Sequence, residues 1–209
     1  MRSRSTGTLG SILVLSLLLP SGAQSQTESI AEFSGNGTLT TRPFHAAERW
    51  EITWDAAGDL FQVLLYRSDG SLADVPASQQ GPGGGDSFQP EAGSYYLQVN
   101  ASGDWSIEVS TVPAPQEGVP PPGAPLFTDR GDGAKNTRPF LAGGPWEVTW
   151  DASGDLFQMF VYRTDSSLAG VAANQTGSGN GSSLQPEAGE FYLQVNAIGS
   201  WELQVKRVE

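Results

Sequence analysis

The chain has 209 residues, no cysteine and one histidine, and its 23 acidic residues against 11 basic ones give a formal net charge of −12. The lack of cysteine excludes disulfides, thiol catalysis and thiolate metal sites. The acidic balance repels the phosphates of nucleic acids and excludes a nucleic-acid partner. One histidine supplies neither a catalytic triad nor a histidine-rich zinc site, so we expect the protein not to be an enzyme.

Residues 1–23 have the pattern of a signal peptide. Arg2 and Arg4 form a basic start, the run 9–19 is apolar, and small residues lead up to Ala23, after which we expect cleavage. The apolar run is shorter than the ~20 residues that a membrane-spanning helix needs, and an uncleaved anchor is the alternative. We therefore expect a bacterial protein that is secreted or periplasmic, with no membrane span in the mature chain.

The remaining sequence is an internal repeat. The segment 50–55 (WEITWD) returns as 146–151 (WEVTWD), and the same offset aligns the two copies without a gap as far as the C-terminus. We expect one domain over 28–110 and a second over 125–207. The segment 111–124 between them is rich in proline, which favours an extended, semi-rigid linker.

Each copy has the pattern of short β-strands. Apolar and polar residues alternate in 50–55, the segment 60–66 is apolar on both faces, and glycine- and aspartate-rich turns separate such runs. Several short strands in a domain of about 80 residues predict an all-β fold, with two tandem β-sandwiches of jelly-roll type. We expect large aromatic side chains to form the core, namely Trp50, Trp54, Phe61 and Trp105, with Trp146, Trp150, Phe157 and Trp201 in the second copy.

Four segments of the first copy, together with their counterparts in the second copy, resemble a known family. They are GDLFQVLLY at 58–66, the Asp-Gly turn at 69–70, EAGSYYLQV at 91–99 and GDWSIEV at 103–109. In this order they resemble the bacterial pre-peptidase C-terminal domain and related β-sandwich modules of exported proteins. The resemblance implies a jelly-roll-like accessory module of the kind that is attached to secreted enzymes.

Polar and aromatic residues alternate with the apolar core residues of the central strands, and we expect them to share the opposite sheet face. Phenol rings stack on sugar rings, and amides form hydrogen bonds with sugar hydroxyls. The sequence therefore predicts a glycan-binding module with two weak sites paired for avidity. An ordinary solvated sheet face is the alternative, and the module would then be a structural or protein-interaction part of the bacterial envelope. The expected binding residues are Gln62, Tyr66, Tyr96, Gln98 and Asn100, with Gln158, Tyr162, Tyr192, Gln194 and Asn196 in the second copy.

Paired aspartates flank one turn in each copy. Asp55 and Asp59 occupy this position in the first copy, and Asp151 and Asp155 in the second. Carboxylate and turn carbonyl oxygens suit calcium, which is the one cofactor that we consider; the alternative is that these residues only shape the turn. For partners we expect a glycan or an envelope protein, and we expect the chain itself to be a monomer.

Overall fold

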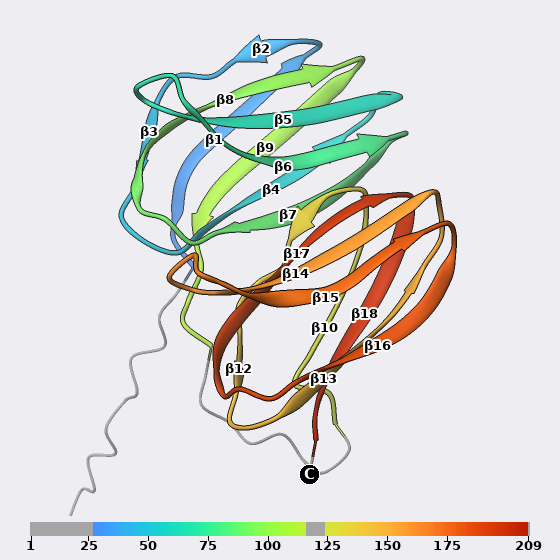
Figure 1. Cartoon of the computed structure of the whole chain (residues 1–209). Coiled ribbons are helices and arrows are strands. Elements are labelled where there is room, and N and C mark those ends of the chain that lie inside the picture. The colour runs from blue at the N-terminus through green and yellow to red at the C-terminus, as the bar shows by residue number, and fades with distance from the viewer. Residues whose placement is uncertain (1–26, 116–123, 209) are drawn as a thin grey trace, which may run out of the picture.

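The computed structural model describes residues 27–115 and 124–208 (Figure 1). The signal peptide predicted over 1–23 and most of the linker predicted over 111–124 lie outside these residues. The described part is all-β, and its four sheets form two similar β-sandwich-like halves, so the predicted fold class is confirmed. The described residues form no helix, and therefore no helix that could cross a membrane.

The first half, in blue and green in Figure 1, consists of two antiparallel sheets. The strand order is β1-β9-β4-β7 in one sheet and β2-β8-β5-β6 in the other, where the short β3 also pairs with β8. Strands far apart in the chain are thus neighbours in a sheet, which is the arrangement of Greek-key and jelly-roll sandwiches. The strands are β1 (Ser29–Asn36), β2 (Leu39–Thr40), β3 (Phe44–Ala46), β4 (Trp50–Ala56), β5 (Leu60–Arg67), β6 (Leu72–Gln80), β7 (Gly83–Gln89), β8 (Gly93–Ala101) and β9 (Asp104–Thr111).

The second half, in yellow to red, repeats this topology strand for strand. Its sheets have the orders β10-β18-β13-β16 and β11-β17-β14-β15, and β12 pairs with β17 as β3 does with β8. The strands are β10 (Phe127–Asp132), β11 (Lys135–Asn136), β12 (Phe140–Ala142), β13 (Trp146–Ala152), β14 (Leu156–Arg163), β15 (Leu168–Thr176), β16 (Gly179–Gln185), β17 (Gly189–Ile198) and β18 (Ser200–Arg207).

The core of each half lies between its two sheets and follows the alternation in the sequence. In β4, Trp50, Ile52 and Trp54 are buried, and the indole Nε1 of Trp54 donates a hydrogen bond to Gln79 Oε1 at 2.9 Å, so the polar edge of the ring has a partner. All the predicted aromatic core residues are buried except Trp150, which is partly buried. The alternation therefore predicted the core, because the apolar face of each strand is buried against the other sheet of the same half.

The two halves also pack against each other, along a contact that we call the seam. The edge strands β6 and β7 of the first half face β11 and β17 of the second, and Ser78 in β6 bridges Ala134 next to β11. Phe88, Val112 and Tyr192 form a separate small apolar cluster there. The repeats are thus in direct contact in addition to being joined through the segment between them.

Candidate functional site

The predicted polar face of the first half lies on the outer side of β5 and β8. The rings of Tyr66 and Tyr96 stack with centroids 5.3 Å apart and planes at 10°. Beside them, Asn100 donates from Nδ2 to Gln62 Oε1 at 3.2 Å, and Gln98 donates from Nε2 to Asn100 Oδ1 at 3.5 Å. All five residues are half-buried and point away from the core, so the structure brings them together as a phenol pair beside a row of amides.

The same face of the second half is partly covered. Tyr162 and Tyr192 stack in the same way, with centroids 5.5 Å apart, but Phe88 of the first half meets Tyr192 edge-on at 5.4 Å. Tyr192 is only 5% exposed as a result. Burial raises the pKa of its phenol, and the nearby Tyr162 phenol and Asp74 carboxylate add to the shift. The expectation of two equivalent open faces is corrected, because the first half covers Tyr192.

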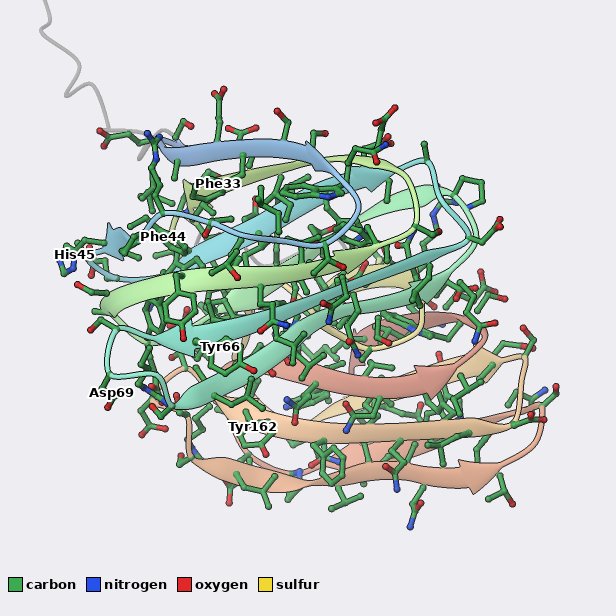
Figure 2. The ribbon with its side chains drawn as sticks, turned by 90° about the horizontal axis from the view of Figure 1, so that it is seen from above. Phe33, Phe44, His45, Tyr66, Asp69 and Tyr162 are labelled. Atoms are coloured by element: carbon green, nitrogen blue, oxygen red, sulfur yellow. The ribbon has the colours of Figure 1, made fainter. Side chains whose placement is uncertain are left out.

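The three remaining predicted residues of the second half lie beside the seam or on its open side. Gln194 and Asn196 line a hollow of about 260 Å³ between β6 and β11. Gln158 donates from Nε2 to Asn174 Oδ1 at 3.1 Å, on the side toward β15. These amides therefore do not form the row that their counterparts form in the first half. Figure 2 labels Tyr66 and Tyr162, the equivalent half-buried tyrosines of the two halves.

Ion pairs fasten the seam on either side of the Phe88 contact. Arg138 binds Glu51 through two hydrogen bonds of 2.6 Å, and these bonds raise the pKa of the guanidinium. Arg49 binds Glu190 in the same bidentate manner, at 2.6 and 2.9 Å. Glu51 lies on the outward face of β4, where the alternation predicts exposure, yet its side chain is only 4% exposed. The second half is what buries it.

A lysine at the seam is almost fully enclosed by acidic groups. Lys135 Nζ lies 2.8 Å from Asp129 and 3.2 Å from Asp86, which belongs to the other half. Burial raises the pKa of the Asp129 carboxyl, and Lys135 opposes that shift. Next to it, Asn136 donates from Nδ2 to Asp74 Oδ2 at 2.9 Å. Because its ammonium has two carboxylate partners, Lys135 can be buried without leaving an unpaired charge.

An acidic groove of about 700 Å³ runs along this part of the seam. It takes carboxylates from both halves, including Asp86 and Asp132, together with the cations of Lys135 and Arg130. Sequence reasoning missed this groove because its residues come from distant parts of the chain. One signal was available: Lys135 stands where the first copy has Leu39, a change from apolar to charged in an otherwise similar repeat.

The predicted calcium residues remain on turns and strand ends. Asp55, Asp59, Asp151 and Asp155 are exposed, and the main-chain oxygen of Asp59 accepts a hydrogen bond from Gly81 N at 2.8 Å, which joins this turn to the turn between β6 and β7. Within residues 27–115 and 124–208, no three or more acidic, histidine or cysteine side chains come together in a way that could hold a metal ion. Calcium at these positions stays a prediction.

Comparisons with known proteins give only distant likenesses. No protein-family model matches the chain, and no curated protein matches it. Among solved structures, the PBSX exported protein XepA is 9% identical at a TM-score of 0.33, with 87% of each chain covered. A conserved protein of unknown function from Pseudomonas aeruginosa is 11% identical at 0.27, over 85% of this chain and 78% of that one. TM-scores this low carry no argument about function, and the resemblance to pre-peptidase C-terminal modules stays a prediction.

One match corrects an expectation drawn from the sequence. A variant of Bacillus subtilis oxalate decarboxylase is 11% identical at a TM-score of 0.27, over 85% of this chain and 68% of that one, and further variants of the same enzyme match similarly. An enzyme is thus among the matched structures, so the sequence-based expectation that the protein is not an enzyme is wrong: it excluded the class of enzymes, and that exclusion does not hold. The match assigns no activity to this chain.

Proposed function

We propose that the protein is an exported binding protein that holds extracellular or cell-surface glycan on the outer face of β5 and β8. The observation that carries this proposal is the stacked pair Tyr66–Tyr96 beside the amides of Gln62, Gln98 and Asn100. A sugar ring has an apolar face that packs on a phenol and hydroxyls that exchange hydrogen bonds with amides. The leader pattern of residues 1–23 supports export.

The proposed site is single, although the chain is a repeat. In the second half the equivalent Tyr192 is covered by Phe88, so a sugar ring does not reach both phenols of that pair. We therefore expect binding to depend on the first half alone and to saturate at one ligand site per chain. This differs from the paired sites that the sequence favours.

Binding to insoluble polysaccharides and to a glycan array tests the proposal. We expect Tyr66→Ala to weaken binding about tenfold or more, since a lost stacking contact costs about 1 kcal/mol or more beyond the buried area. Tyr162→Ala is the matched control, because it removes the equivalent phenol next to the seam and should leave glycan binding unchanged. Equal loss in both variants, or no glycan bound by the native protein, would contradict the proposal. Repeating the assay without calcium tests Asp55 and Asp59.

A protein-interaction module of the envelope is the second candidate. The seam favours it, because in the second half this same sheet face, through Tyr192, contacts a protein edge. A pull-down from envelope extract that returns no specific protein would count against this role. Saturable glycan binding that is lost in Tyr66→Ala would favour the first candidate.

A further inference from the structure

The seam joins two different faces of the repeated unit. We call the surface that the second half presents the head face and the surface that the first half presents the tail face. Because the halves are repeats, each half carries a version of both faces, and one head face and one tail face remain outside the seam. The head face in the seam consists of Lys135, Asn136, Arg138, Glu190 and Tyr192, and its unused version consists of Leu39, Thr40, Arg42, Ser94 and Tyr96.

The tail face has an unused version in the second half. The tail face in the seam consists of Arg49, Glu51, Asp74, Asp86, Phe88 and Val112, and its unused version consists of Pro145, Glu147, Gly170, Ser182, Leu184 and Val208. The backbone places the equivalent residues alike. Val112 N donates to Arg49 O at 2.8 Å, and Val208 N donates to Pro145 O at 3.0 Å.

The central contacts of the seam have counterparts on the unused faces. Arg42 and Glu147 stand in the positions of the ion pair between Arg138 and Glu51, with the same signs of charge on the same faces. Leu184 stands in the position of Phe88 and is 60% exposed, whereas Phe88 is fully buried. The unused faces thus keep the apolar contact and one ion pair of the seam.

The peripheral contacts of the seam change on both faces together. The pair Lys135–Asp86 corresponds to Leu39 and Ser182. The pair Arg49–Glu190 corresponds likewise to two neutral residues. At the positions equivalent to these two pairs, both unused faces are therefore uncharged, and association would leave no charge facing an apolar residue. Such paired replacement keeps the two faces compatible, since an unpaired charge in a contact is costly.

We propose that two copies of this chain associate head to tail, with the unused tail face of one copy receiving the unused head face of the next. The contact repeats the geometry of the seam, with Arg42 against Glu147 and Tyr96 against Leu184. Leu184 and Leu39 are both exposed, Leu39 to 44%, so none of the described residues covers either side chain. A contact between two different faces leaves one head face and one tail face unused in a pair, so further copies add to form an open row, or a closed ring where the rotation between copies allows it. This replaces the monomer expected from the sequence.

Charge reversal tests the proposal by sedimentation equilibrium of the purified protein, expressed from the full-length sequence. We expect the mass of the native protein to rise with concentration. The single variants Glu147→Arg and Arg42→Glu should each stay monomeric, because like charges then meet across the contact. An equimolar mixture of the two variants should associate again, since each meets the opposite charge on the other. Glu108→Arg, on the outer face of the first half's other sheet, is the charge-matched control and should associate as the native protein does.

Three sedimentation results would contradict head-to-tail association. A native protein that stays monomeric up to about 1 mM would overturn the proposal, and so would association that neither single variant weakens or that the mixture fails to restore. The variants leave Tyr66 and Tyr96 in place, so their effect on association does not depend on glycan binding. Because Tyr96 belongs to both the proposed glycan site and the head face, a bound glycan should also reduce association.

Discussion

Replacing Phe88 with alanine measures how strongly the seam holds the two halves. Phe88 is fully buried and meets Tyr192 edge-on at 5.4 Å, although it lies on an outward face of its own half. Burying a phenylalanine side chain contributes about 1.5–3 kcal/mol, and an aromatic pair adds about 0.5–1.5 kcal/mol. We therefore expect Phe88→Ala to lower the free energy of unfolding by about 2–4.5 kcal/mol.

The repeat supplies the control for this measurement. Leu184 has the same position in the second half but is 60% exposed, so Leu184→Ala should change the free energy of unfolding by no more than about 0.5 kcal/mol. The assay is thermal and denaturant unfolding followed by tryptophan fluorescence. At this chain length the Phe88 variant should lose about 4–18 °C in Tm. Small and equal shifts in the two variants would refute the seam, because independent halves would leave Phe88 as exposed as Leu184.

Two further substitutions probe the seam. The buried Tyr192 phenol stays neutral in the fold but ionises in the unfolded chain above its ordinary pKa of 10.0, so its stabilising contribution is complete below pH 10 and is lost as pH rises toward the raised folded-state pKa. Tyr192→Phe should reduce this alkaline loss of stability in unfolding curves at pH 9 and pH 11; an equal loss in the variant and the native protein would contradict the burial of this phenol. Gly133 has φ of +79°, and a Cβ there would lie 2.0 Å from the Ser78 carbonyl oxygen across the seam. Gly133→Ala should therefore lower Tm well beyond the repeat-matched Gly37→Ala, whose Cβ would meet only the Ala101 carbonyl oxygen at an ordinary 3.9 Å and which adds only the left-handed strain of about 1–2 kcal/mol; equal losses would contradict the close contact.

The fold within each half follows from local patterns. Alternation in β4 placed Trp50 and Trp54 inside, and the repeat extended the same prediction to β13. The polar face of β5 and β8 was predicted by the same rule, because side chains on a strand point alternately to its two faces. Trp150 is the exception, since it is only partly buried.

The seam could not be predicted in this way, because it depends on how two complete sandwiches meet. Glu51 and Tyr192 have the alternation of exposed residues, and each is buried by the other half. The difference between the copies was the available signal. Lys135 replaces Leu39 and is 7% exposed, and a charge introduced at one copy of a repeated position indicates a partner that the other copy lacks.

The sequence differences between the two repeats also determine which contact forms first, the seam within one chain or the contact between chains. The internal seam has the polar pairs of Lys135 with Asp86 and Arg49 with Glu190, and the chain holds its two faces at high effective concentration. The unused faces keep only Arg42 and Glu147 with an apolar neighbour, and they must meet between separate molecules. The internal contact is therefore formed in every copy before copies meet. Only the unused faces remain for association, so a weak contact can join copies without competing with the seam.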